Sequence, residues 1–274
     1  MTLRLGWFTT ARGEGSRAMY ETVAAAIAAG ELDAEFAFVF CNRDRGEDGV
    51  TDAFFELVRV NAHPLVTRSS VSFRHTAGGE RSRFGETLPP WRERYDEQVE
   101  RALDGRPFDL GVLAGYMLIF TAGFVSRHPL LNLHPALPGG PAGTWREVIR
   151  ALIRGGARES GVMLHLAIAE VDAGPVVACC RYPIRGPGFD ALWAELAPRL
   201  DGIDDDILER TPLFAAIRAE GVRYEAPLLL ATFAEFAAAR LRVAGSRVLG
   251  PGGAPREAVD LTSEVRGRLV ALPR

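Results

Sequence analysis

The stretch GVLAGYMLIFTAGFVSRHPLLNLHPALPGGPAGTWREVIRALIRGGARESGVMLHLAIAEVDAGP, residues Gly111–Pro175, decides the fold. Much of it consists of apolar runs typical of buried strands, or of Gly- and Pro-rich sequence. Four polar residues stand out against these surroundings: Asn132 and His134 just before a proline, His165 inside an apolar run, and Asp172 in a Gly-Pro turn. We therefore expect a polar site, suited to acyl transfer, at the ends of buried strands.

Upstream of this stretch, apolar runs alternate with helical patterns. The β-α-β-α-β order predicts a parallel sheet with right-handed crossovers. The expected fold is α/β, a Rossmann-like, mostly parallel twisted sheet flanked by helices. The predicted strands are 3–9, 34–41, 64–67, 108–114, 130–133, 162–167 and 175–182, and the predicted helices are 17–29, 51–60, 91–103 and 143–154.

Two segments depart from this alternation. Residues 68–90 are rich in Arg, Ser and Gly without a clear period, which predicts a loop. Beyond Gly186 the pattern predicts a helical range over 189–220 with a break near 199–205, a helix over 224–239, a β-hairpin over 241–248 and a closing helix over 263–271. We expect one catalytic domain, residues 1–185, with a helical and β-hairpin extension, residues 186–274, packed on the same domain.

Composition excludes several classes of partner. The chain has 274 residues, 47% hydrophobic and 24% charged, with a net charge of -3, which gives no reason to expect nucleic acid or an anionic membrane as partner. No apolar run reaches the roughly 18 residues that span a bilayer, and no secretory leader pattern opens the chain. Three cysteines, two of them adjacent, favour a reducing, cytoplasmic compartment. Asn occurs only three times, so Asn132 beside a histidine is conspicuous.

A glycine-rich loop, Gly13-Glu14-Gly15-Ser16, lies between the first predicted strand and helix. Glycines let a ligand approach the backbone, and a helix N-terminus favours an anion. Ser16 can donate a hydrogen bond or cap the helix. A tight turn with a serine cap is the simpler alternative. A dinucleotide fingerprint would need a third glycine and an acidic residue after the second strand, so a nicotinamide cofactor is disfavoured.

Asn132 and His134 are two residues apart on a predicted strand, so their side chains point to the same side. In an open parallel sheet, ligands bind at the carboxyl ends of the strands. An amide can donate to an oxyanion, and an imidazole can move a proton near neutral pH. Taken singly, Asp172 could be a turn residue and His165 a core histidine. All four in one window favour a catalytic site.

The motif N-x-H-P followed by H-x6-D-x-G-P resembles the phosphoribosylglycinamide formyltransferase family, and more broadly the folate-dependent formyltransferases. The resemblance covers roughly the first 185 residues. It implies 10-formyltetrahydrofolate as co-substrate and direct transfer of its formyl group to an amine, without a metal. Asn132, His134 and Asp172 would be catalytic, with protonated His134 and Asn132 stabilising the oxyanion and His165 in support.

The resemblance also implies binding roles. The pterin would lie against the segment after the fourth strand and against the turn before Asp172, and Arg92 would meet the glutamate tail. The glycine-rich loop would hold the acceptor's phosphate. The donor residues implied are Arg92, Tyr116, Met117, Leu118, Ile119, Ala169, Glu170 and Val171, and the acceptor residues are Gly13, Glu14, Gly15, Ser16 and Arg17.

Departures from the family pattern leave the acceptor open. Glu14 stands where the ribonucleotide enzymes have Asn, and the chain has no Lys, so Arg218 or Arg223 would have to replace the family's second phosphate anchor. Glycinamide ribonucleotide in purine biosynthesis is the leading acceptor; an amino sugar, amino acid or natural-product amine is the alternative. A metal-dependent hydrolase using His134, His165 and Asp172, a non-catalytic folate or nucleotide sensor, and a homodimer also remain open.

Overall fold

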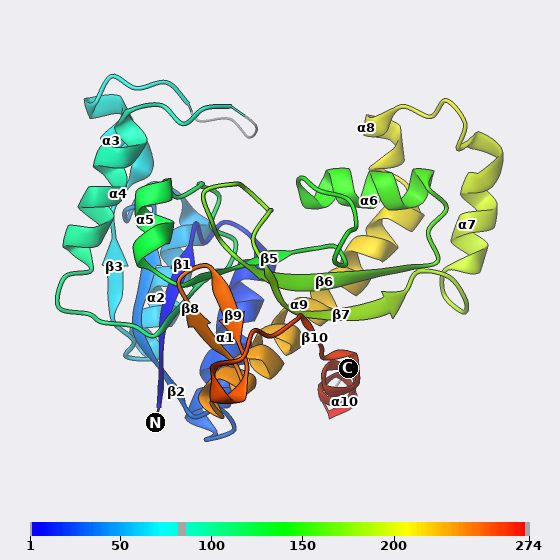
Figure 1. The fold of residues 1–274 in the computed structure, drawn as a ribbon. Helices are drawn as coiled ribbons and strands as arrows, with labels where there is room; N and C mark the ends of the chain where they lie inside the picture. Colours follow the sequence, from blue (N-terminus) through cyan, green and yellow to red (C-terminus); the bar gives the residue numbers. More distant parts are fainter. Residues whose placement is uncertain (1, 82–85, 272–274) are drawn as a thin grey trace. The chain divides into compact units, whose positions relative to one another are not determined.

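The computed structural model describes residues 2–81 and 86–271 (Figure 1). Its main sheet pairs the strands in the order β10-β7-β6-β5-β4-β1-β2-β3. The pairs β1–β2, β2–β3, β1–β4, β4–β5 and β7–β10 are parallel, and β6–β7 is antiparallel. The predicted mostly parallel sheet is confirmed. The strands are β1 (Leu3–Thr9), β2 (Ala34–Cys41), β3 (Leu65–Thr67), β4 (Leu110–Leu113), β5 (Leu130–His134), β6 (Glu159–Leu166), β7 (Val176–Pro183), β8 (Arg242–Ala244), β9 (Arg247–Leu249) and β10 (Val259–Asp260).

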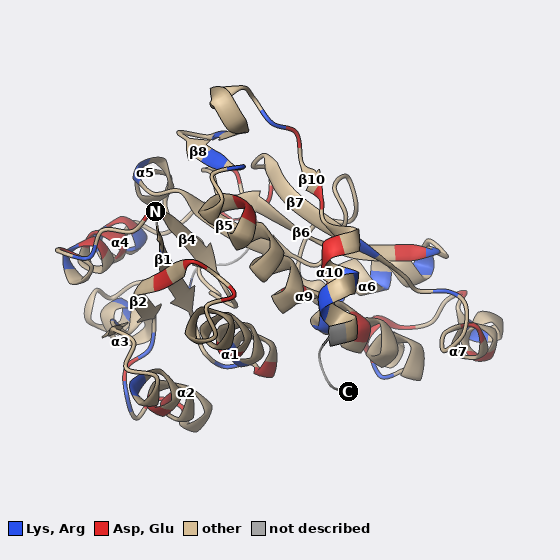
Figure 2. Cartoon of the chain, turned by 90° about the horizontal axis from the view of Figure 1, so that it is seen from below, with Lys and Arg blue, Asp and Glu red and all other residues tan. Residues whose placement is uncertain are grey.

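Helices and a separate β8–β9 hairpin complete the chain, as the sequence predicts. Figure 2 shows most of the charged residues on helices and loops, with a few on strands such as β8. Strands β4 and β5 carry no Lys, Arg, Asp or Glu, in keeping with strands buried on both faces. The helices are α1 (Glu14–Ala28), α2 (Gly49–Val60), α3 (Ser70–Thr76), α4 (Trp91–Ala102), α5 (Ala122–Arg127), α6 (Trp145–Arg154), α7 (Asp190–Leu196), η1 (Ala197–Arg199), α8 (Asp205–Leu208), α9 (Pro212–Ala237), η2 (Pro251–Gly253) and α10 (Thr262–Ala271).

The chain divides into two compact units. Unit 1 comprises Met1–Asn132, Leu166–Pro175 and Phe233–Arg256, and unit 2 comprises Leu133–His165, Val176–Thr232 and Glu257–Arg274. Strand β5 and helix α9 each run from one unit into the other. No helix in the described parts of the chain is long and apolar enough to cross a membrane.

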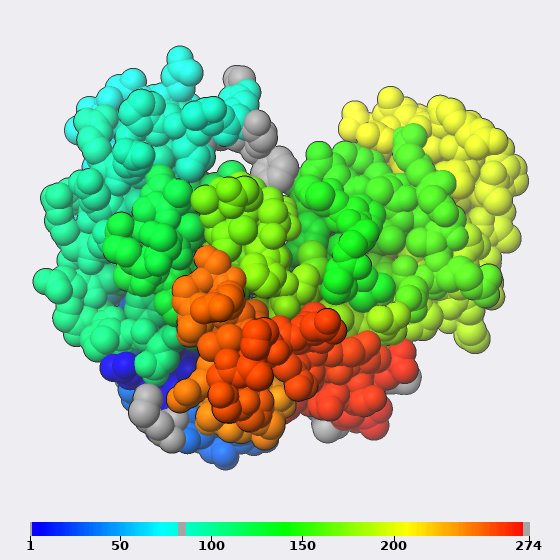
Figure 3. All heavy atoms as spheres, in the orientation of Figure 1, coloured from blue at the N-terminus to red at the C-terminus, as the bar shows by residue number. Residues whose placement is uncertain are grey.

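The prediction of a loop over residues 68–90 is wrong in part, because helix α3 lies within it. The Ser69 hydroxyl accepts a hydrogen bond from the Ser72 N–H at 3.0 Å and so caps the helix. Phe73 packs against the main apolar cluster of unit 1. A helix of 7 residues is too short for hydrophobic periodicity to reveal. Its cap and the packing of Phe73 stabilise it, and neither is visible in the sequence pattern. Figure 3 shows this segment as the cyan surface at the upper left, and residues 82–85 lie outside the described residues.

The predicted break near residues 199–205 is present, since η1 ends at Arg199 and α8 begins at Asp205. The predicted boundary between a helix that ends at 220 and one that begins at 224 is wrong, since α9 continues through Gly221 and Pro227. A Cβ on Gly221 would lie 2.8 Å from the Tyr182 hydroxyl oxygen. The glycine therefore allows the close approach of α9 to β7 rather than ending the helix. Shorter elements missed by the sequence are α5 and β10.

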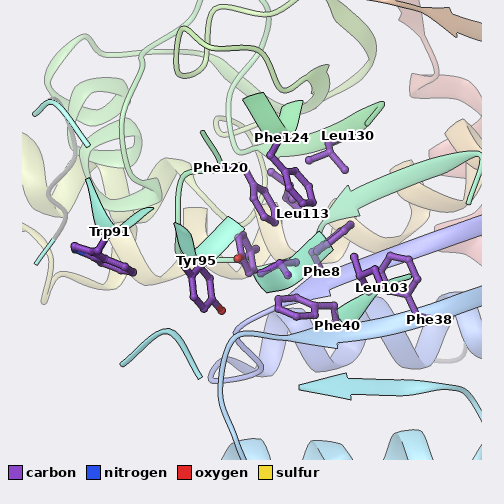
Figure 4. Packing of buried hydrophobic residues seen from close by; sticks show 12 residues of the cluster. Phe8, Phe38, Phe40, Trp91, Tyr95, Leu103, Leu113, Phe120, Phe124 and Leu130 are labelled. Atoms are coloured by element: carbon purple, nitrogen blue, oxygen red, sulfur yellow. The ribbon is translucent and has the colours of Figure 1, made fainter. Parts of the chain in front are cut away.

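The core of unit 1 centres on Phe8 of β1, whose ring meets other aromatic rings at centroid distances from 5.3 to 6.2 Å. Figure 4 shows Phe120 and Phe124 beside each other close to Phe8. Their rings stack at 4.0 Å and 7°. The rings around Phe8 belong to Phe38, Phe40, Phe108, Tyr116, Phe120 and Phe124.

Substitution of Gly111 can show how tightly this core is packed. A Cβ there would collide with the buried Leu130 side chain and lie 3.2 Å from the Phe8 ring. Because overpacking forces neighbours off their rotamers, we expect Gly111→Ala to lower the free energy of unfolding by about 1–3 kcal/mol. The matched control is Gly49→Ala in the first turn of α2, where nothing lies within 4 Å of the added carbon. Chemical denaturation measures both, and equal stabilities would refute the tight packing at Gly111.

Candidate functional site

Strand β5 carries Asn132 and His134 on the same side of its backbone. Asn132 aligns with Leu113, the last residue of the parallel strand β4. It therefore lies at the carboxyl edge of the sheet, where open α/β sheets bind ligands. This is the position that the sequence predicts.

Asp172 lies in the loop between β6 and β7, and the structure brings it to Asn132. The Asn132 Nδ2 donates to Asp172 Oδ1 at 3.3 Å. Asp172 adopts a φ of 57°, in the left-handed region that is uncommon for a residue other than glycine. Strained backbone of this kind clusters at functional sites. The Ala167 N–H donates to the Leu130 carbonyl at 2.8 Å and fastens the start of the loop to β5.

The two histidines belong to unit 2 and are both buried. Their ring centroids are 6.3 Å apart at an interplanar angle of 70°. The His134 Nε2 lies 3.1 Å from the Pro141 carbonyl oxygen. That carbonyl can accept a hydrogen bond only, so it favours a proton on Nε2. His165 lies at an irregularity in the β6–β7 pairing.

The predicted donor residues differ in exposure. Met117 and Val171 are exposed large hydrophobic side chains, with 75% and 42% of their surface accessible. Tyr116 is buried, and burial raises the pKa of its hydroxyl well above the ordinary value. Arg92 is also fully buried. Ala169 and Glu170 are exposed, and Leu118 and Ile119 are half-buried.

The two segments predicted to bind the formyl donor pack against the same part of the core. Leu118, after β4, and Ala167, before the Asp172 turn, pack against the same apolar cluster of unit 1. The Tyr116 ring stacks on Phe120 at 4.8 Å, and Phe120 stacks on Phe124. Both segments are therefore in contact with the core of unit 1.

The glycine-rich loop differs from its predicted form in one respect. Helix α1 begins at Glu14, so Ser16 lies inside its first turn and its hydroxyl donates to the Gly13 carbonyl at 2.8 Å. Gly13 is the N-cap, and no side chain caps the helix. A serine N-cap at Ser16 is therefore wrong. The residue that an isolated sequence marks as a cap can instead close the first turn, because its hydroxyl reaches a carbonyl three residues back.

The structure joins the glycine-rich loop to the segment after β4. The Thr10 N–H donates to the Gly115 carbonyl at 3.1 Å, and the Met117 N–H donates to Thr10 Oγ1 at 2.9 Å. Gly115 has a φ of 68°, and a Cβ there would lie 2.8 Å from the Ser16 Cβ. The predicted acceptor and donor residues of unit 1 are therefore neighbours. Sequence reasoning missed Thr10 and Gly115, and their place directly after β1 and β4 is the signal that could have found them.

The charges around the glycine-rich loop are mostly paired. Arg12 Nε lies 3.2 Å from Asp48, and Arg17 Nε lies 2.9 Å from Glu21. N–H donors at the start of α2, chiefly that of Thr51, lower the pKa of Asp48, and Arg12 lowers it further. Glu14 is exposed in the first turn of α1. This end of α1 therefore presents a carboxylate beside the backbone N–H groups.

A family model described as formyl transferase matches residues 12–187, more than half of the chain. The chain belongs to the formyl transferase family. The matched range holds Asn132, His134, His165 and Asp172 in the order that the sequence motif requires.

Similar proteins carry one name in several organisms. The chain is 35% identical over 109 residues to the phosphoribosylglycinamide formyltransferase of Escherichia coli, covering 38% of this chain and 50% of that protein. It is 34% identical over 139 residues to the Mycobacterium tuberculosis protein of the same name, covering 47% and 57%. The match thus spans about half the length of each relative.

Solved structures show the same fold at low identity. A phosphoribosylglycinamide formyltransferase from Coxiella burnetii superposes with a TM-score of 0.63 at 19% identity, covering 94% of this chain and all of that one. A formyltetrahydrofolate deformylase from Burkholderia mallei gives 0.60 at 15% identity, covering 91% and 70%. The predicted formyltransferase fold is confirmed.

In the described parts of the chain, no group of three or more His, Cys, Asp or Glu side chains is placed to hold a metal ion. Metal analysis of the purified protein remains the direct test of the metal-hydrolase alternative.

Substitution of Gly174 can show whether the backbone of the Asp172 loop is held in one conformation. A Cβ on Gly174 would collide with the Leu166 carbonyl oxygen, which is backbone and cannot turn aside. We expect Gly174→Ala to lower the free energy of unfolding by about 1–3 kcal/mol and to displace Asp172 from Asn132. Ala173→Ser, at an exposed neighbouring position, should change stability by no more than about 0.5 kcal/mol. Thermal unfolding compares the two, and an unchanged Gly174→Ala midpoint would mean that the loop adapts freely.

Proposed function

We propose that this protein transfers a formyl group from 10-formyltetrahydrofolate to a primary amine, in the cytoplasm, with glycinamide ribonucleotide of purine biosynthesis as the first candidate acceptor. The hydrogen bond between Asn132 and the strained Asp172 at the carboxyl edge of the sheet carries the proposal. Membership of the formyl transferase family and the names of the relatives support it. The proposed donor contacts are those of the exposed or half-buried residues around Met117 and Val171.

The proposed reaction needs no covalent enzyme intermediate. The neutral amine of the acceptor attacks the formyl carbon on N10 of the donor and forms a tetrahedral oxyanion. The Asn132 amide, which has N–H donors, and the His134 imidazole stabilise that charge. The Asp172 carboxylate orders a water that moves a proton from the attacking nitrogen to N10. Collapse then releases tetrahydrofolate and the formylated amine, and His165 supports the imidazole.

Removing the oxyanion donor or the carboxylate tests these roles. We expect Asn132→Ala and Asp172→Asn each to lower kcat by about a hundredfold or more, since one oxyanion donor alone contributes about 3 kcal/mol. Asn61→Ala, which removes an amide at the end of α2, is the matched control and should retain wild-type turnover. Steady-state assays with 10-formyltetrahydrofolate measure the effect. Near-wild-type kcat in either site variant, with the protein folded, would rule out the assigned roles.

A second candidate, formyl transfer to a different amine, is favoured by the charge at the glycine-rich loop. A carboxylate in the first turn of a helix already compensates its positive end. Glu14 therefore opposes a phosphate at this position, while Arg12 and Arg17 are engaged by Asp48 and Glu21. An unphosphorylated amine, such as an amino sugar or amino acid, would not meet that repulsion.

The arginines proposed as second phosphate anchors are also paired. In unit 2, Arg218 Nη1 lies 2.8 Å from Glu225, and its guanidinium carbon lies 4.8 Å from the centre of the Trp145 ring. Arg223 lies 2.6 Å from Glu220. A phosphate would have to compete with these carboxylates, which adds weight to the second candidate.

An acceptor panel separates the candidates. We expect formyl transfer to glycinamide ribonucleotide, with Glu14→Gln lowering the KM for that substrate about two- to fivefold because a repulsion of about 0.3–1 kcal/mol is removed. The KM for an uncharged amine should not change. Turnover of another amine without turnover of the ribonucleotide would select the second candidate. Loss of formyl from the donor without any amine would indicate water as the acceptor.

A further inference from the structure

The buried Arg92–Asp96 pair lies under the segment that the proposed function assigns to the formyl donor. Both residues are on the inner face of α4, with 0% and 2% of their surface accessible. Arg92 Nη2 lies 3.4 Å from Asp96 Oδ1. The Arg92 guanidinium also lies 5.0 Å from the centre of the Trp91 ring and 5.6 Å from that of Tyr95.

Each member of the pair binds the backbone of the segment after β4. Arg92 Nη2 donates to the Ile119 carbonyl at 2.6 Å, and the Thr121 N–H donates to Asp96 Oδ2 at 2.7 Å. Together with the hydrogen bond from the Met117 N–H to Thr10, these fix a backbone group of every second residue from Met117 to Thr121. The segment is irregular, so it has no helix or strand ladder of its own to hold it.

The pair is costly in terms of stability. Arg92 Nε and Nη1 are buried without a hydrogen-bond partner, and burial raises the pKa of Asp96 although Arg92 opposes this. Replacing a buried ion pair with apolar residues is often neutral or stabilising. A buried pair with unsatisfied donors is therefore poorly explained by stability alone. Its two backbone hydrogen bonds supply an alternative reason, the placement of the segment.

We propose that Arg92 and Asp96 are positioning residues that hold the backbone of Met117–Thr121 in the conformation that binds the formyl donor. This rests on the proposed function, and it replaces direct contact of Arg92 with the donor's glutamate tail. The guanidinium points into the protein interior, where its atoms reach Ile119 and Asp96. It acts on the donor through the Ile119 carbonyl and through the shape of the Met117 and Leu118 backbone.

The decisive experiment compares two donors and three variants. The donors are 10-formyltetrahydrofolate and 10-formyltetrahydropteroate, which lacks the glutamate tail. For Arg92→Met we expect the KM for both donors to rise by the same factor, about tenfold or more, because a charged hydrogen bond to the segment is lost. Arg92→Lys keeps an N–H donor for the Ile119 carbonyl, so its KM for each formyl donor should lie between those of the wild type and Arg92→Met. Asp96→Asn keeps a hydrogen-bond acceptor for the Thr121 N–H but loses the negative charge. It should also raise the KM for both formyl donors.

Hydrogen exchange supplies a readout independent of turnover. The Met117 and Thr121 amides should exchange at least about tenfold faster in Arg92→Met than in the wild type, because their segment loosens. The matched control is Arg4→Met, which breaks the partly exposed Arg4–Asp109 pair at the opposite end of β1. It should leave both the exchange of the segment and the donor KM unchanged.

Each outcome decides a separate point. A KM increase confined to the glutamate-bearing donor would overturn the proposal in favour of direct tail contact. Unchanged exchange in Arg92→Met and Asp96→Asn would overturn it as well. If Arg92→Met does not fold, Arg92→Lys and Asp96→Asn give the same two readouts. If the wild type transfers no formyl group, the proposed function fails, whereas faster exchange would still show that the pair positions the segment.

Discussion

The packing of Phe8 joins the sheet to the segment beside the candidate site. Phe8 is on the central strand β1, and its ring meets aromatic rings from β2 and from the segment after β4. A parallel sheet is buried on both faces, so its strands must be apolar throughout. The aromatic rings that satisfy this requirement in unit 1 also support Tyr116 and Leu118. The same burial that stabilises the sheet therefore fixes a surface segment.

Hydrogen bonds, mostly between backbone groups, link the segments that follow the strands of unit 1. Thr10 after β1 binds Gly115 and Met117 after β4, and the loop that holds Asp172 is fastened to β5 through Ala167 and Leu130. These links are short hydrogen bonds between residues distant in sequence. Fixing each loop in one conformation costs conformational entropy, which these hydrogen bonds help to offset. These hydrogen bonds connect the loops of unit 1 to one another and to β5, and Asn132 is hydrogen-bonded to Asp172.

The residues of the proposed reaction and those of the proposed acceptor site belong to different segments of the chain. Asn132 lies in β5 and Asp172 in the loop between β6 and β7, and both fall within the range that matches the formyl transferase family. Glu14 and the paired Arg12 and Arg17 lie at the start of α1, where the chain departs from the family pattern. The proposed reaction and the proposed acceptor can therefore be tested separately, by variants in these two segments.

The sequence by itself determined the mostly parallel sheet, and it identified Asn132, His134 and Asp172 as candidate site residues. It could do so because long apolar runs and a motif with fixed spacing are local signals. Tertiary structure alone decided the rest. It revealed helix α3, held by the Ser69 cap and Phe73, and the continuity of α9 through Gly221. It also showed that the Arg92 side chain points inward and donates to the Ile119 carbonyl. The sequence could not reveal these features, because hydrogen bonds between distant segments leave no trace in local periodicity.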